Sequence, residues 1–138
     1  EGHERKFIED LILKLGLEKD VFLPGFVDNP YKWMAKASVM VSSSKTEGCP
    51  NNILEGLCLN TPIVATDCPG DTGAILEHGK WGKLVNVGDH QEMAKAILET
   101  LNNTKKTRTK MRADEFSEND IISSYVSVLT SKTEMNKT

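Results

Sequence analysis

The strongest constraint on the fold is the alternation of short, wholly apolar segments with longer amphipathic ones. The short segments are residues 21–23, 39–41, 63–65 and 84–85. Strands that are apolar throughout are typical of a sheet buried on both faces, and helices between them connect parallel strands by right-handed crossovers. The sequence therefore predicts an α/β fold, with a doubly wound parallel sheet and helices on both faces.

The amphipathic segments have the start and stop signals of helices. Apolar residues recur at helical spacing over residues 7–15, and a glycine follows where that helix should end. Asp89 and Glu92 form a capping-box-like start to another helix. The positions expected to begin or end helices are Gly16, Pro30, Asp89 and Ser117.

The chain is expected to form one domain with a short C-terminal extension. At 138 residues it can bury one core. We assign residues 1–116 to the α/β domain and residues 117–132 to a last helix, with residues 133–138 as a frayed tail. Residues 102–112 are rich in Lys, Arg and Thr, which predicts a solvated helix or linker.

Composition argues against several kinds of function. With 17 basic and 20 acidic residues the net charge is −3, which does not favour a domain devoted to nucleic acid. No apolar run approaches the ~20 residues that span a membrane. Cys49, Cys58 and Cys68 have no metal-ligand or Cys-x-x-Cys spacing. Three such cysteines suit reduced thiols in a cytoplasmic protein without a metal site.

The loop that follows residues 39–41 carries the chemistry. Glu47 and Glu55 are separated by seven residues, and the segment between them leads into a helix. Amides at a helix start lack partners within the helix and attract anions, and carboxylates accept hydrogen bonds from hydroxyl groups. A nucleotide sugar offers both kinds of group. The residues expected on the buried face of this helix are Ile53, Leu54, Leu57 and Cys58.

Five blocks in this order resemble the C-terminal, donor-binding domain of the family 4 retaining glycosyltransferases, which have the GT-B fold. The resemblance extends over residues 21–98, and the pair of glutamates alone would not make it specific. The blocks are residues 22–27, 29–31, 42–55, 61–69 and 82–89. The resemblance implies a Rossmann-like domain that binds a nucleotide diphosphate sugar.

The resemblance also implies roles for individual residues. Glu55 would bind the ribose hydroxyls of the nucleotide. Glu47 would face the hydroxyls of the donor sugar and stabilise positive charge at the anomeric carbon. The turn that contacts the base would comprise Gly25, Phe26 and Val27. The backbone cradle for the diphosphate and the sugar would comprise Gly48, Cys49, Pro50, Asn51 and Asn52, with the Cys49 side chain as a small packing residue.

Each role has a simpler structural alternative. Glu55 could be a solvent-facing helix residue, and Glu47 a carboxylate favoured by the helix dipole. Phe26 could belong to the core. Tyr31 and Trp33 are expected in the core or at an interface rather than as stacking platforms.

Two features depart from the family pattern. Ala74 stands where many members have a glutamate, which puts details of the pocket in doubt. The family's diphosphate-gripping Arg and Lys, its first strands and an N-terminal acceptor domain would all precede Glu1. The resemblance therefore predicts a domain that is incomplete at its N-terminus, and no residue here receives the role of those basic residues.

The sequence thus predicts the donor-binding part of a transferase that moves a sugar to a glycan, lipid-linked or polysaccharide acceptor. No cofactor is expected, and a UDP-sugar is slightly preferred over a GDP-sugar. The resemblance places the protein in the cytoplasm and allows it to be peripheral to the membrane. A nucleotide-sugar epimerase or a phosphorylase on the same fold is one alternative, and a non-catalytic nucleotide-sugar-binding module is another. A new glycosidic product would distinguish the transferase from both.

Overall fold

The computed structural model describes residues 2–103 and 108–134. The chain divides into two units, Glu1–Pro30 and Tyr31–Thr138. The first contains the helix α1 (Arg5–Leu15), which ends at Gly16 with a left-handed φ of 67°. The amide of Gly16 donates to the carbonyl of Leu13 at 3.1 Å. A residue without a Cβ adopts this conformation at low cost, so the predicted helix end is confirmed.

The strand predicted at residues 21–23 is wrong. This segment is irregular, because a strand requires a hydrogen-bonded neighbour and no strand of the described chain pairs with it. The carbonyl of Leu23 instead accepts a hydrogen bond from Arg5 Nη2 at 3.0 Å. Phe22 remains 77% exposed, so its apolar side chain is not buried in the described structure.

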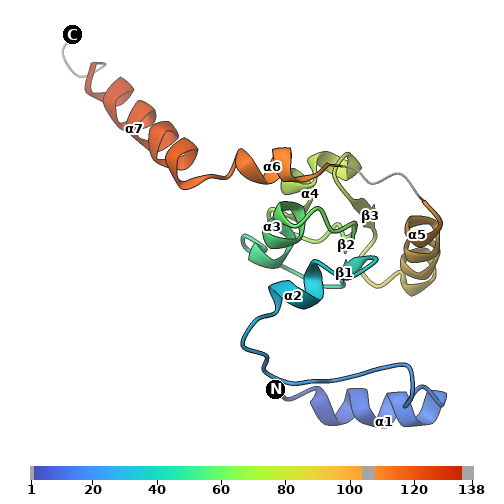
Figure 1. The fold of residues 1–138 in the computed structure, drawn as a ribbon. Coiled ribbons are helices and arrows are strands. Elements are labelled where there is room, and N and C mark those ends of the chain that lie inside the picture. The colour runs from blue at the N-terminus through green and yellow to red at the C-terminus, as the bar shows by residue number, and fades with distance from the viewer. Residues whose placement is uncertain (1, 104–107, 135–138) are drawn as a thin grey trace. The chain divides into compact units, whose positions relative to one another are not determined.

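The second unit is built around a parallel sheet of three strands in the order β1-β2-β3 (Figure 1). Val41 of β1 lies opposite Val64 of β2, and Ala65 of β2 lies opposite Leu84 of β3. The three strands predicted in this region are confirmed to within one residue at each end. Their bounds are Met40–Ser42 for β1, Ile63–Thr66 for β2 and Lys83–Val85 for β3.

Helices cover both faces of this sheet. The α3 and α6 helices pack with Ile63 and Ala65 on one face, and α5 packs with Val64 on the other (Figure 1). Alternate residues of β2 therefore enter two different cores, which explains why all residues of this strand are buried. The helices are α2 (Tyr31–Met34), α3 (Asn51–Cys58), α4 (Thr72–Ile75), the 3-10 helix η1 (Glu77–Gly79), α5 (His90–Asn102), α6 (Lys110–Asp114) and α7 (Glu118–Glu134).

The predicted helix caps are present. The carboxylate of Asp89 accepts a hydrogen bond from the Glu92 amide at 2.8 Å at the start of α5. The Ser117 hydroxyl accepts one from the Asp120 amide at 3.3 Å at the start of α7. The α7 helix runs to Glu134, and residues 135–138 of the expected tail lie outside the described residues. The same is true of residues 104–107 in the expected linker.

One prediction about α3 needs correction. Its buried residues are Ile53, Gly56 and Leu57, whereas Cys58 is exposed. Successive helical residues are rotated by about 100°, so a face centred on residues 53, 56 and 57 turns residue 58 outward. A Cβ on Gly56 would lie 2.9 Å from Met40 Cε, so the glycine allows α3 to lie close to β1.

Candidate functional site

The two glutamates lie on either side of the start of α3 in the sequence. Glu47 is in the loop that leaves the carboxyl end of β1, and Glu55 is on α3. Ligands of open parallel sheets bind outside the carboxyl ends of the strands, so the loop is where this architecture places a ligand. A cavity of about 180 Å³ lies at the same ends of all three strands. Its lining includes Ser43, Lys45, Thr66 and Asn86.

The carboxylate of Glu47 is held by neighbouring groups. The Ser44 hydroxyl donates to Glu47 Oε1 at 2.6 Å. The carbonyl of Ser44 in turn accepts a hydrogen bond from Thr66 Oγ1, at the end of β2, at 2.5 Å. Thr66 is only 4% exposed, so this chain of contacts connects Glu47 to the buried sheet. Neither Ser44 nor Thr66 was singled out from the sequence, although both lie in the blocks that carry the family resemblance.

The start of α3 has backbone amides available to an anion. Pro50 occupies the N-cap and supplies no side-chain cap. The amides of Ile53 and Leu54 donate to the Pro50 carbonyl, but no described residue accepts a hydrogen bond from the amides of Asn51 or Asn52. The first turn also carries no acidic residue. In the sequence, these two amides lie between the two glutamates. They are at the start of α3, where the helix dipole has its positive end.

Glu55 is half-buried, one turn into α3, and has a partner on α2. The Tyr31 hydroxyl donates to Glu55 Oε1 at 3.2 Å. Tyr31 is 49% exposed and Trp33 is 63% exposed, so neither side chain is in the core, and the predicted interface position stays a prediction. No local pattern relates residues that are 24 positions apart, and only the packing of α2 near α3 shows this contact.

The remaining residues of the predicted cradle are exposed to different degrees. Gly48 is exposed, and a Cβ added to it would have no atom within 4 Å. Pro50 is buried at the helix start. The thiol of Cys49 is exposed, so the packing role predicted for this side chain is wrong. Cys49 lies in the loop before the N-cap of α3, so it is not on a helix face that would direct its side chain toward the core.

The residues of the predicted base-binding turn belong to the first unit. Gly25 has a left-handed φ of 73°, which favours glycine. Phe26 is 85% exposed, so the alternative of a core phenylalanine is wrong in the described structure. Val27 is half-buried. The base-binding role of this turn stays a prediction.

Ala74 stands where many members of the resembled family have a glutamate. Its backbone takes part in hydrogen bonding between two helices. Its carbonyl accepts a hydrogen bond from Arg112 Nη2 at 2.8 Å, and the Ile75 carbonyl accepts one from Arg112 Nε at 2.9 Å. Arg112 therefore joins α6 to the carboxyl end of α4, where a cation is also favoured by the helix dipole.

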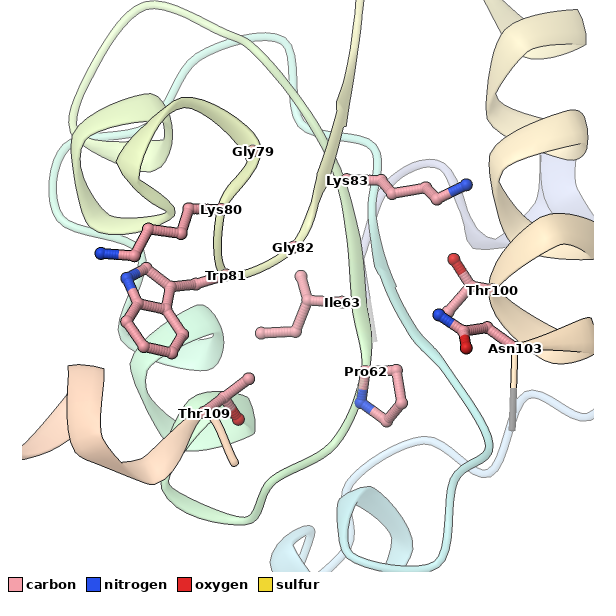
Figure 2. Close-up of a pocket in the computed structure, with 10 residues that line it drawn as sticks. All are labelled: Pro62, Ile63, Gly79, Lys80, Trp81, Gly82, Lys83, Thr100, Asn103 and Thr109. Carbon is pink, nitrogen blue, oxygen red and sulfur yellow. The ribbon is translucent and has the colours of Figure 1, made fainter. Parts of the chain in front are cut away.

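A second cavity lies at the opposite ends of the strands. It has a volume of about 210 Å³ and is lined by the residues that begin β2 and β3, by residues 79–82, by the end of α5 and by Thr109, the N-cap of α6 (Figure 2). Both lysines of its lining are already paired within the protein, Lys80 with Glu77 and Lys83 with Glu99, whereas Nε1 of Trp81 is buried without a hydrogen-bond partner among the described residues. The hydroxyl of Thr109 donates to the Leu57 carbonyl at 3.0 Å. Ligands of open parallel sheets bind at the carboxyl ends of the strands, so this cavity, at their amino ends and with both lysines already paired, is not the candidate site.

None of the helices in residues 2–103 and 108–134 is both long and apolar enough to cross a membrane.

Comparison with known proteins connects the chain to one family. Residues 1–103 match a family described as "Glycosyl transferases group 1". Over 77% of its length, the chain is 33% identical to the N-acetylgalactosamine-N,N'-diacetylbacillosaminyl-diphospho-undecaprenol 4-alpha-N-acetylgalactosaminyltransferase of Campylobacter jejuni. Over 96% of its length, it is 32% identical to the lipopolysaccharide core biosynthesis glycosyltransferase LpsE of Rhizobium meliloti. The chain spans 30% and 40% of these two relatives.

The fold is similar to that of a solved glycosyltransferase. The chain superimposes on the apo form of the lipopolysaccharide outer core galactosyltransferase WaaB with a TM-score of 0.84 and 17% sequence identity. The match covers 95% of this chain and 39% of that one. The predicted α/β fold is therefore confirmed.

Proposed function

The chain belongs to the group 1 glycosyltransferases, and on that premise we propose that it binds the nucleotide diphosphate sugar donor of a retaining transferase. It has the fold of the GT-B glycosyltransferases. The complete reaction would move the sugar from this donor to a glycan, lipid-linked or polysaccharide acceptor.

The arrangement around the start of α3 is the observation that carries this proposal. Within the described chain the amides of Asn51 and Asn52 have no acceptor, and in the sequence they lie between two carboxylates that each accept a hydrogen bond from a hydroxyl group. Amides at the positive end of a helix bind phosphate oxygens, whereas carboxylates accept hydrogen bonds from sugar hydroxyls. A nucleotide diphosphate sugar presents its phosphates between two sugar rings, which is the same order of groups.

The roles follow from this order. Glu55 would accept hydrogen bonds from the ribose hydroxyls, and Glu47 from the donor sugar. In the reaction the bond between the anomeric carbon and the diphosphate oxygen breaks, and negative charge grows on the leaving diphosphate. The amides at the start of α3 would be in place before the reaction, so they would stabilise this charge without reorganising, which lowers the barrier. Positive charge at the anomeric carbon would be stabilised by the carboxylate of Glu47.

The names of two relatives support the acceptor class. One acts on a sugar attached to diphospho-undecaprenol, and the other takes part in lipopolysaccharide core biosynthesis. We therefore propose a glycan or lipid-linked acceptor and a reaction in the cytoplasm, with the acceptor presented at the membrane. Acceptor recognition is expected outside these 138 residues, and so are the basic residues that grip the diphosphate. The isolated chain should accordingly bind nucleotides weakly and transfer no sugar.

Thermal unfolding of the intact protein with UDP-, GDP- and ADP-sugars tests the donor class. A ligand that binds only the native state stabilises it by about 2.7 kcal/mol at 100 times its Kd, so a true donor raises Tm in a concentration-dependent way. UDP-sugars are the first to test. The matching sugar 1-phosphates serve as controls, because they lack the ribose that Glu55 would bind.

Product analysis then separates the alternatives. A new glycosidic bond with the anomeric configuration of the donor supports the retaining transferase. An altered free sugar nucleotide without an acceptor would indicate an epimerase. Binding without turnover, in the presence of glycan and lipid-linked acceptors, would indicate a non-catalytic module and contradict the proposed function.

A further inference from the structure

The loop that contains Glu47 is bound along its backbone by the turn that follows β2. The amide of Glu47 donates to the carbonyl of Pro69 at 3.0 Å, and the amide of Asp71 donates to the carbonyl of Gly48 at 3.0 Å. These two hydrogen bonds run in opposite directions and enclose the peptide between Glu47 and Gly48. The turn at residues 69–71 therefore determines where this peptide lies.

Gly70 makes this approach possible. Its φ is +119°, a conformation that residues with a side chain rarely adopt. A Cβ at this position would lie 1.9 Å from the carbonyl oxygen of Glu47 and 2.7 Å from its carbonyl carbon. Both atoms are backbone, so no side-chain rotation could relieve the overlap. Any side chain at residue 70 must displace either the turn or Glu47.

We propose that Gly70 is a positioning residue for Glu47, and that together with Ser44 it holds the carboxylate in place at the donor sugar. Gly70 permits the turn to bind the backbone of Glu47, while the Ser44 hydroxyl holds Oε1. The inference rests on the proposed function, in which Glu47 faces the reacting sugar. Reacting groups need placement to within a fraction of an ångström, and an error of about 1 Å can cost a factor of about 100 in rate.

The chain offers a matched control for the backbone effect. Gly79 also has a positive φ, of +104°, but a Cβ there would have no atom within 4 Å. Gly79→Ala therefore introduces similar backbone strain without touching Glu47. A general loss of stability should appear in both alanine variants, whereas displacement of Glu47 should appear only in Gly70→Ala.

Kinetics of the intact protein test the positioning role. Gly70→Ala should lower kcat about 100-fold, and Gly79→Ala should leave it within about threefold of the unaltered protein. Adding Glu47→Gln to Gly70→Ala should cause little further loss, because both changes remove the same interaction. Equal kcat values for the two alanine variants would contradict the inference, as would independent, multiplying effects of Gly70→Ala and Glu47→Gln.

A measurement that does not depend on activity keeps the two proposals apart. Amide hydrogen exchange followed by NMR should show protection at Glu47 and Asp71 that is lost in Gly70→Ala and retained in Gly79→Ala. Protection that is unchanged in Gly70→Ala would overturn the inference even if the protein transfers sugar. No transfer by the unaltered protein with any donor would instead overturn the proposed function, while the exchange pattern still decides whether Gly70 positions Glu47.

The Ser44 hydroxyl provides a second route if Gly70→Ala fails to fold. Ser44→Ala should lower kcat about tenfold, because it removes a hydrogen bond to a charged group, with little effect on Tm. Ser38→Ala is its control, since Ser38 is exposed and precedes β1, away from the carboxyl ends of the strands. Equal kcat values in these two variants would contradict the positioning of Glu47 by Ser44.

Discussion

Replacing Glu55 by glutamine tests the donor site most directly. The change keeps the size of the side chain but removes the negative charge and one acceptor oxygen. In the structure Oε1 of Glu55 already accepts a hydrogen bond from Tyr31, so this single contact leaves most of the carboxylate's acceptor sites open. Two adjacent ribose hydroxyls could occupy them. We therefore expect Glu55→Gln to weaken binding of the free nucleotide diphosphate.

The magnitude follows from the kind of hydrogen bond that is lost. A hydrogen bond to a charged, partly buried group contributes about 1–3 kcal/mol, and 1.4 kcal/mol corresponds to a tenfold change in Kd. Glu55→Gln should therefore raise the Kd about 5- to 150-fold. Tyr31→Phe removes only the exposed 3.2 Å contact and should change the Kd by no more than about threefold.

Isothermal titration of the intact protein with the free nucleotide diphosphate measures these effects. Glu118→Gln is the matched control, since it removes the same charge from an exposed position in the first turn of α7. An unchanged Kd in Glu55→Gln would refute the ribose role. A similar loss in Glu118→Gln would show that net charge, and not a contact with the ribose, is responsible.

Three further predictions concern catalysis and stability. Glu47→Gln should lower kcat about 100-fold and leave the Kd of the free nucleotide diphosphate nearly unchanged, as steady-state kinetics and titration can measure. A change in the Kd alone would mean that Glu47 and Glu55 have the opposite roles. Leu57→Ala should lower the free energy of unfolding in urea by about 2–5 kcal/mol, because Leu57 is fully buried, whereas exposed Leu98→Ala should change it by less than about 0.5 kcal/mol; equal effects would contradict the assigned core. A hydrogen bond from Lys80 lowers the pKa of Glu77 below its ordinary 4.5. The ionised carboxylate therefore stabilises the fold above pH 4.5, and this contribution is lost as the pH falls through the lowered pKa. Glu77→Gln should therefore lower Tm at neutral pH but not in strong acid, and a difference in Tm that stays constant from neutral pH to about pH 3 would refute this.

The sequence predicted those features that depend on neighbouring residues. The wholly apolar segment at residues 63–65 became the central strand, buried on both faces. Gly16 ended α1 and Asp89 began α5, because a left-handed residue and an N-cap carboxylate act on the adjacent turn of chain. The loop between the glutamates was recognised for the same reason, since an uncapped helix start after a buried strand is a local pattern.

The predictions from the sequence were wrong where the conformation or burial of a residue depends on residues that are distant in the sequence. Residues 21–23 have the composition of a strand, yet no described strand is hydrogen-bonded to them. Cys58 has the spacing of a buried helix residue, but the approach of Gly56 to β1 set which face of α3 points inward. Phe26 is apolar, yet burial requires other side chains to pack against it.

The sequence by itself thus determined the three strands of the sheet, the caps of α1 and α5, and the presence of two carboxylates on either side of a helix start. Only the tertiary structure decided how those carboxylates are held. It brought the Tyr31 hydroxyl to Glu55, and it placed the Ser44 hydroxyl and the turn at Gly70 against Glu47. The physical reason is that helices and turns form through contacts between near neighbours. Loops far apart in the chain meet only because parallel strands leave their carboxyl ends at one edge of the sheet.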